Sequence, residues 1–248
     1  MKLDQIIATR PKKTIYRDGD SVIKVFEASY AKSAVLNEAL NMARMEETGI
    51  EMPHLREVCM ADGKWAIVSE FVAGTTLTEL MAGDPLRYRQ YLTRMVDVQL
   101  HIQSYSHDGL MNLNDKLHQR IRETELDAAC RYALRTRIAS LPNQNRICHG
   151  DIRPSNLIIT PENKAFVLDW AHVTQGSGAA DAAHTWLYFV LKGDQPHADE
   201  YLSLFSKKGG VPQEVVMRWV PVIAAADSVH AYEEDKGTLL DFAKKVLE

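Results

Sequence analysis

The chain has 248 residues, of which 46% are hydrophobic, and its formal net charge is −4. This length and composition allow a substantial buried core, arranged as one large domain or two modest ones. The acidic balance and the lack of a basic run argue against nucleic acid as a partner. The first residues lack an apolar signal core and no apolar run reaches membrane-spanning length, so we expect a cytoplasmic protein with no membrane partner.

Cysteine and histidine give no pattern typical of a metal site or of a disulfide framework. The sequence has an odd number of cysteines, and no two of them are closely spaced as a pair: Cys59, Cys130 and Cys148. The nine histidines form no His-Glu-x-x-His arrangement. The sequence leaves the oligomeric state open.

The first predicted element is a β-hairpin over residues 13–26. Its two strands flank Asp18-Gly19, a pair suited to a tight turn that requires positive φ. Lys24 is the unusual residue, because its neighbours in the second strand are apolar. Taken alone, such a lysine is typical of an edge strand, where a charge discourages aggregation.

A helix is predicted from about Ala31 to Thr48, because strong helix formers fill this stretch and Gly49 is a stop signal. Glu38 lies in its middle, where an exposed surface charge is the plainer interpretation. The apolar positions on one side predict the buried face: Val35, Leu36, Ala39, Leu40 and Ala43.

A second hairpin is predicted over residues 55–71 around the turn pair Asp62-Gly63. Helical periodicity then dominates the chain. The predicted helical regions are 85–106, 113–141, 179–191, 198–207 and 212–248, and Pro221 is expected to kink or divide the last of them. Strands followed by helices indicate an α+β protein with two lobes.

The most informative segment reads His149-Gly150-Asp151-Ile152-Arg153-Pro154-Ser155-Asn156. A strand-like run follows it, and a second apolar run ends in Asp169. Phosphoryl transfer needs a carboxylate facing the acceptor hydroxyl and oxygen ligands that hold Mg²⁺ against nucleotide phosphates. Asp151, Asn156 and Asp169 match these roles. The plainer alternative is a proline-containing turn in which side chains bond only to the turn backbone.

The order of these residues resembles the catalytic loop and metal-binding strand of the aminoglycoside phosphotransferase and choline kinase family, protein-kinase-like enzymes that phosphorylate small molecules. That family typically has His-Gly-Asp-x-His-Pro-x-Asn. This chain departs from it at Arg153 and at Ser155. The resemblance implies a protein-kinase-like bilobal α+β fold, with a small antiparallel sheet and one main helix at residues 1–71 and a mostly helical catalytic lobe at 72–248.

The resemblance also implies how a nucleotide would be held. Lys24, oriented by Glu38, is similar to the strand lysine that positions the phosphates. Ser69 and Phe71 lie where the family's backbone contacts adenine at the hinge. A glycine-rich phosphate loop is absent from the sequence, so the choice between ATP and GTP stays open.

Three residues near the catalytic loop take roles from the same resemblance. Asp151 would orient the acceptor hydroxyl and accept its proton. Arg153 would direct a positive charge at the transferring phosphoryl group, with a surface cation as the alternative. Asp181 would open a helix and brace the loop, although aspartate is also a common helix-start residue.

The implied reaction transfers the γ-phosphoryl group of ATP or GTP to a hydroxyl of a small molecule, with Mg²⁺. A protein Ser/Thr kinase is one alternative, disfavoured because Asp169-Trp170-Ala171 lacks Phe-Gly after the aspartate and few residues precede the next helix. A nucleotide-binding protein that has lost turnover is the other.

Acidic and aromatic residues of the helical lobe suit a cationic acceptor such as an amino alcohol or an aminoglycoside. A neutral sugar or nucleoside is the alternative, since three consecutive acidic residues also mark a solvated helix end. The residues considered for this pocket are Tyr232, Glu233, Glu234, Asp235, Trp186, Tyr188 and Trp219.

Overall fold

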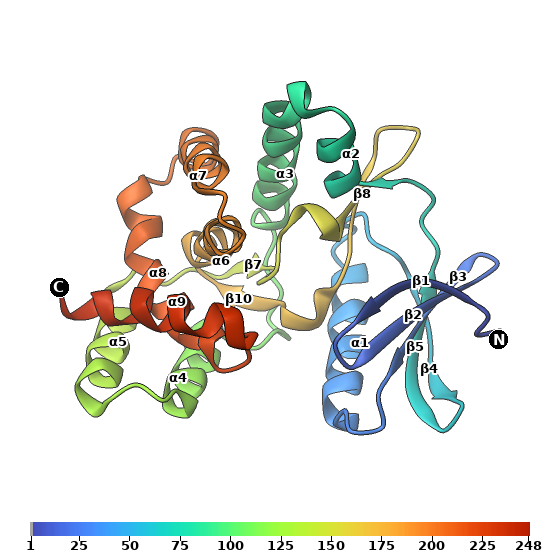
Figure 1. Cartoon of the computed structure of the whole chain (residues 1–248), viewed down its shortest axis with the longest axis horizontal. Coiled ribbons are helices and arrows are strands. Elements are labelled where there is room, and N and C mark those ends of the chain that lie inside the picture. Colours follow the sequence, from blue (N-terminus) through green and yellow to red (C-terminus); the bar gives the residue numbers. More distant parts are fainter. Residues whose placement is uncertain (1) are drawn as a thin grey trace. The chain divides into compact units, whose positions relative to one another are not determined.

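The computed structural model describes residues 2–248, and the chain divides into two compact units. Unit 1 contains the chain up to Gly83 together with Pro154–His172, and unit 2 contains Asp84–Arg153 and Val173–Glu248. Unit 1 holds the main sheet and unit 2 is mostly helical (Figure 1), which confirms the predicted α+β class. The predicted division into functional lobes at residue 71 stays a prediction.

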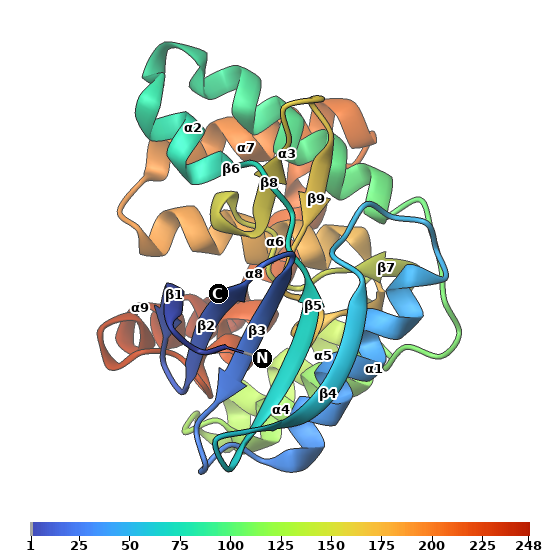
Figure 2. The same ribbon diagram turned by 90° about the vertical axis from the view of Figure 1, so that its right-hand side faces the viewer.

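Unit 1 is built on a five-stranded antiparallel sheet with the strand order β1-β2-β3-β5-β4, and the strands lie next to one another in this order in Figure 2. The strands are β1 (Gln5–Arg10), β2 (Lys13–Asp18), β3 (Ser21–Phe26), β4 (Leu55–Ala61) and β5 (Lys64–Glu70). β3 pairs with β2 on one side and with β5 on the other. Lys24 therefore lies on a central strand, and the edge-strand interpretation of this lysine is wrong.

Both predicted hairpins are confirmed, and their turns use the residues that tolerate positive φ. The loop between β2 and β3 consists of Gly19 and Asp20, one residue later than predicted, and the φ of Gly19 is 61°. The loop between β4 and β5 consists of Asp62 and Gly63, as predicted, with φ of 48° and 74°. These two turns fix the register of the sheet.

Helix α1 (Lys32–Glu46) contacts β4 and β5. The predicted buried face was wrong in part, because Leu36 and Leu40 are 43% and 48% exposed. The face that is buried includes two polar residues, Glu38 and Asn41. The spacing of apolar residues could not predict which face of α1 is buried, because the burial of Glu38 depends on partners outside the helix.

A second, three-stranded sheet in unit 1 has the order β6-β8-β9. It is formed by β6 (Thr75–Thr76), β8 (Leu157–Ile159) and β9 (Ala165–Val167), and the short helices beside it are α2 (Leu77–Gly83), η2 (Pro154–Asn156) and η3 (Trp170–His172). Leu157 pairs with Val167, and the N–H of Leu168 donates to the carbonyl of Asn156 over 2.8 Å. The segments that carry Asn156 and Asp169 therefore lie side by side.

Unit 2 consists mainly of helices around α6 and α8. Its elements are η1 (Pro85–Arg87), α3 (Tyr88–Ile102), α4 (Leu113–Glu123), α5 (Ala128–Ser140), α6 (Gly178–Leu191), α7 (Gln195–Gly209), α8 (Gln213–Ser228), α9 (Glu233–Lys244), η4 (Lys245–Leu247) and the paired strands β7 (Arg146–Cys148) and β10 (Thr174–Gly176). The region predicted as one helix at 113–141 is two, because Asp127 caps a new helix through the N–H of Cys130. Pro221 lies inside α8 without dividing it. No helix among residues 2–248 has the length and apolar character needed to cross a membrane.

We predict that Gly63→Ala destabilises the protein by about 1–2 kcal/mol, because an L-residue with a side chain pays this cost in the left-handed region. A methyl group at Gly63 would touch nothing within 4 Å, so the effect isolates the backbone. Gly83→Ala is the matched control, since its added methyl is equally free and its φ lies outside the left-handed region. Urea unfolding of both variants checks this, and equal losses would contradict the turn assignment.

Candidate functional site

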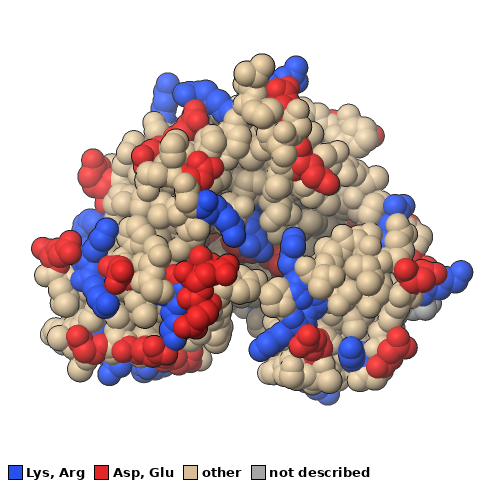
Figure 3. Space-filling view, in the orientation of Figure 1, with Lys and Arg blue, Asp and Glu red and all other residues tan. Residues whose placement is uncertain are grey.

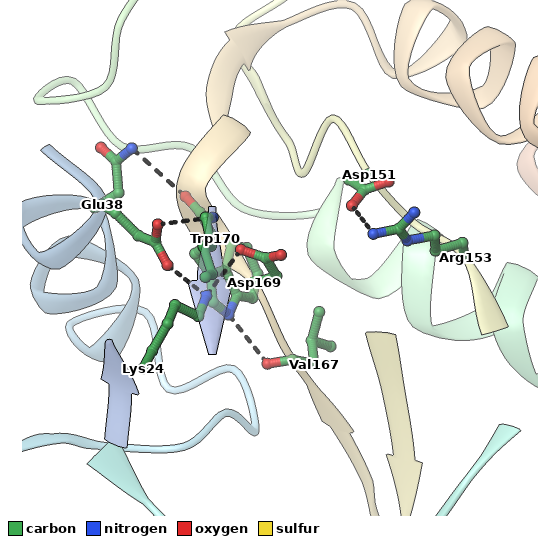
Figure 4. A network of polar contacts seen from close by, with 9 residues as sticks. Lys24, Glu38, Asp151, Arg153, Val167, Asp169 and Trp170 are labelled. Carbon is green, nitrogen blue, oxygen red and sulfur yellow. Dashed lines mark hydrogen bonds and ion pairs between the residues drawn. The ribbon is translucent and has the colours of Figure 1, made fainter. Parts of the chain in front are cut away.

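Lys24 is held by two carboxylates from different elements of unit 1. Its Nζ lies 2.5 Å from Glu38 Oε1 on α1 and 3.2 Å from Asp169 Oδ1, in the turn that follows β9 (Figure 4). Glu38 is 2% exposed, so it is not the surface charge that the plainer interpretation predicted. The structure thus brings together three of the residues that the sequence singled out.

Lys13 joins this cluster and was missed by the sequence analysis. Its Nζ lies 3.4 Å from Glu38 Oε2 and also faces the rings of Phe26 and Tyr30 at 5.4 and 5.7 Å. The signal that could have found it is the hairpin register, in which Lys13 pairs with Phe26 while Lys24 is two residues earlier on the same face of β3. Both oxygens of Glu38 therefore meet an ammonium group.

Asp169 occupies a strained backbone position. Its φ is 65°, a value that aspartate tolerates better than most residues. The next residue fixes the turn: Trp170 is 1% exposed, its indole N–H donates to the carbonyl of Val167 over 3.1 Å, and its own carbonyl accepts from the Asn41 side chain. Figure 4 shows these bonds around Asp169. The carboxylate direction is thus set by a buried anchor.

The charges in this cluster stabilise each other. Burial disfavours the ammonium form of Lys24, but the carboxylates of Asp169 and Glu38 outweigh it and raise the pKa of Lys24. Burial would raise the pKa of Asp169, but the positive charges of Lys24, Lys13 and His172 hold that pKa well below its usual range. Lys24 is therefore a fixed cation and Asp169 a fixed anion across the neutral range.

Asn156 and Asp169 lie on neighbouring segments, and their binding of magnesium stays a prediction. Asn156 is 5% exposed, and the bond from Leu168 N–H to its carbonyl keeps the two segments together. Among residues 2–248 no group of three or more His, Cys, Asp or Glu is arranged to hold a metal ion. Magnesium does not need such a group, because it binds through one or two carboxylates and the phosphates of its substrate. The residues present fit this kind of site.

Ser69 and Phe71 lie at the end of β5, where the hinge was expected. Ser69 pairs with Val22 on β3 and with Leu55 on β4, so it belongs to the ladder on both sides. The N–H of Phe71 donates to the carbonyl of Asp20 over 2.8 Å, and the Arg17 guanidinium lies 3.8 Å from the centre of the Phe71 ring. Contact of this backbone with adenine stays a prediction.

In unit 2 the loop that the sequence predicts to be catalytic places Asp151 beside Arg153. Arg153 Nη2 lies 3.1 Å from Asp151 Oδ2 (Figure 4), and the two side chains are 31% and 25% exposed. Helix α6 also holds the loop, because the N–H of Gly150 donates to Asp181 Oδ1 over 2.7 Å. Asp181 is 1% exposed on α6, as expected for a residue that braces the loop. Arg153 is thus an ion-pair partner of Asp151, and its role at the phosphoryl group stays a prediction.

Two of the aromatic residues considered for a cationic acceptor are buried. Trp186 and Trp219 are 5% and 0% exposed, so Trp219 belongs to the core and cannot line an open pocket. The acidic run 233–235 forms the first turn of α9, where negative charge favours the helix dipole. Acidic side chains gather over α9 on the face shown in Figure 3. The solvated helix end therefore explains this run.

The sequence model of the phosphotransferase enzyme family (APH) matches residues 12–215. A search of curated proteins finds no match. Similar solved structures include choline kinase LicA from Streptococcus pneumoniae, with 14% identity, a TM-score of 0.68 and coverage of 100% of this chain and 93% of that chain. Aminoglycoside-3'-phosphotransferase of type VIII has 17% identity, a TM-score of 0.66 and coverage of 91% and 92%. A thermostable mutant of an aminoglycoside phosphotransferase in ternary complex with AMP-PNP and hygromycin B has 12% identity, a TM-score of 0.67 and coverage of 98% and 90%. At these identities the likeness establishes the fold, which is protein-kinase-like as the sequence predicted.

We predict that Lys24→Met lowers the free energy of unfolding by about 1–3 kcal/mol near neutral pH, because Glu38 and Asp169 lose the ammonium group that they share. Because the pKa of Asp169 is lowered in the fold, its contribution to the free energy of unfolding is present above about pH 4 and is lost at lower pH. Because the pKa of Lys24 is raised, its contribution is present below about pH 10 and is lost as the pH rises further. The difference between wild type and variant should therefore be largest between these limits.

Urea unfolding across the pH range measures this difference. Lys164→Met is the matched control, because Lys164 also pairs with a glutamate, Glu51, over 2.9 Å but is 59% exposed. Glu38→Gln combined with Lys24→Met should be less destabilising than the sum of the single variants, since both break one unit. A loss that is independent of pH, or no larger than that of the control, would contradict the role of the cluster.

Proposed function

The chain belongs to the phosphotransferase enzyme family, and we propose that it transfers the γ-phosphoryl group of a nucleoside triphosphate to a hydroxyl of a small molecule. The observation that carries this proposal is the cluster in which Lys24 meets Glu38 and Asp169. A lysine that is fixed as a cation is suited to the negative charge of phosphates, and an aspartate that is fixed as an anion is suited to a divalent metal. The cluster supplies both.

Lys24 is the residue assigned to the phosphates, and Glu38 keeps its ammonium group in place. In the structure the ammonium also pairs with Asp169. Asp169 and Asn156 would hold magnesium, which would supply positive charge beside the phosphate oxygens. Glu38 then stays as the fixed partner of Lys24, and the ammonium keeps its remaining donors for phosphate oxygens.

Asp151 is the residue assigned to the acceptor hydroxyl. Its carboxylate is partly exposed, and it can orient the hydroxyl and take its proton. Arg153 limits the rotation of this carboxylate and adds a positive charge next to the reacting group. Arginine cannot lose its proton in this range, so Asp151 is the proton acceptor of the pair.

The donor is proposed to be ATP or GTP, and the acceptor an amino alcohol, an aminoglycoside or a sugar-like molecule. Support for the donor comes from the similar aminoglycoside phosphotransferase structure that contains AMP-PNP, and support for the acceptor from that structure's hygromycin B and from the choline kinase. A protein kinase is disfavoured, because β10 (Thr174–Gly176) and α6 follow closely after Asp169 and leave little chain for an activation segment.

An acceptor panel tests the proposal. Purified protein with ATP or GTP and Mg²⁺ is offered choline and ethanolamine, amino sugars and aminoglycosides, neutral sugars and nucleosides, and a peptide mixture, and nucleoside diphosphate release is followed. We expect release that depends on one of the small-molecule classes. Release that depends on the peptides alone, or none above the acceptor-free rate, would contradict the proposed function.

We predict that Asp151→Asn lowers turnover by about 10²- to 10⁴-fold, because it keeps the size of the side chain but removes the proton acceptor. Nucleotide affinity should change little. Asp241→Asn on α9, whose carboxylate is 76% exposed, is the matched control and should leave turnover unchanged. Steady-state kinetics decides the matter, and an Asp151 variant with near wild-type turnover would remove this residue from the mechanism.

We predict that Asp169→Asn abolishes the gain in nucleotide affinity that Mg²⁺ gives to the wild type. Asparagine is preferred to alanine because it tolerates the positive φ of this position. Calorimetric titration of ATP with and without Mg²⁺ measures the gain, and Asp62→Asn in the β4–β5 turn is the control. If the Asp169 variant kept the full magnesium-dependent gain, the metal would have to bind elsewhere.

A further inference from the structure

A network of buried polar side chains lies beneath the catalytic loop in unit 2. Its members come from α3 and its C-cap residue Gln103, from α6 and from α7, and each is at most 3% exposed: Gln99, Gln103, Asp181, Thr185 and Tyr201. Burying five polar side chains costs free energy unless each is hydrogen-bonded. Every member of this network has such a bond, so the network is a built feature of the fold.

Two members of the network hold the loop on either side of Asp151. Asp181 accepts from the N–H of Gly150 over 2.7 Å, and the Thr185 hydroxyl donates to the carbonyl of Ile152 over 2.9 Å. Both contacts come from α6, one turn apart, because residues four apart lie on one face of a helix. The loop backbone is therefore fixed before and after the residue assigned to the acceptor hydroxyl.

Gln99 on α3 connects these two contacts. Its side-chain N–H group donates to Asp181 Oδ2 over 3.0 Å and to the Thr185 hydroxyl oxygen at 3.4 Å. Its carbonyl accepts from the Tyr201 hydroxyl over 2.5 Å. Because the tyrosine hydroxyl donates to the oxygen, the amide nitrogen must point towards α6. The hydroxyl of Thr185 then accepts from Gln99 and has its own proton directed at Ile152.

We infer that Thr185, Gln99 and Tyr201 are positioning residues that fix Asp151 through the backbone of its loop. The inference deepens the proposed function and rests on it, since Asp151 matters only if the chain transfers phosphoryl groups. It extends the brace beyond Asp181 to α3 and α7. A displacement of about 1 Å in a reacting group can cost about 10²-fold in rate, so a bond two steps from Asp151 can affect turnover.

The test removes single hydroxyl groups without changing shape. Thr185→Val deletes the hydroxyl that donates to the Ile152 carbonyl, and Thr185→Ser keeps a hydroxyl there. Tyr201→Phe deletes the hydroxyl that donates to Gln99 and keeps the ring that packs near Phe189 and Phe205. Thr124→Val is the matched control, because Thr124 is also buried and its hydroxyl donates to a backbone carbonyl, that of Ile121, over 2.8 Å.

Hydrogen exchange of the peptide covering residues 148–153 is the first readout, because it does not depend on activity. We expect faster exchange in Thr185→Val and in Tyr201→Phe, and wild-type exchange in Thr185→Ser and Thr124→Val. The second readout is nucleoside diphosphate release with ATP and Mg²⁺ and the acceptor found in the panel. There kcat should fall by about 10- to 100-fold in Thr185→Val with KM changed less than about twofold, and recover in Thr185→Ser.

Wild-type exchange in either Thr185→Val or Tyr201→Phe would overturn the inference. So would an unchanged kcat in Thr185→Val, or equal losses of kcat in Thr185→Val and Thr124→Val. If the wild type released no nucleoside diphosphate with any acceptor, the proposed function would fail, while the exchange data would still decide whether the network holds the loop.

Discussion

The charge of Lys24 is the constraint on which unit 1 depends. A lysine on a central strand, 18% exposed at its side chain, must find negative partners, because an unpaired buried ammonium is costly. Glu38 and Asp169 supply them from two segments that are distant in the sequence. The same charges that make the fold tolerable are those that a nucleotide phosphate and a metal ion require, so stability and proposed function share one set of atoms.

The geometry of the cluster follows from simple local rules. The turns at Gly19 and Gly63 set the register of the strands. Because side chains alternate along a strand, Lys24 and Lys13 lie on the same face of the sheet. Helix α1 buries the face that carries Glu38. The buried Trp170 holds the strained turn at Asp169. Unit 2 uses a different device, in which side chains of α6 grip the loop backbone on both sides of Asp151.

The parts of this arrangement that could be predicted from the sequence are those with local signals. Asp62-Gly63 marks a turn by its own chemistry, and the order of residues around Asp151 marks the loop. The buried face of α1 could not be predicted, because Leu36 and Leu40 are more hydrophobic than Glu38 and Asn41, yet only the latter pair meets partners across the fold. The hairpin register could place Lys13 on the face of Lys24, but its contact with Glu38 depends on the burial of Glu38. The burial of Trp219 depends on contacts with distant residues, which periodicity does not indicate.

In the proposed reaction the γ-phosphoryl group passes to an acceptor hydroxyl and not to water. Phosphorus NMR of a reaction that contains the protein, ATP, Mg²⁺ and the best acceptor of the panel tests it most directly, because a phosphate monoester and inorganic phosphate give separate signals. We expect the γ-phosphate signal to be replaced by a monoester signal as ADP accumulates. Inorganic phosphate as the only product, at a rate independent of the acceptor, would contradict it.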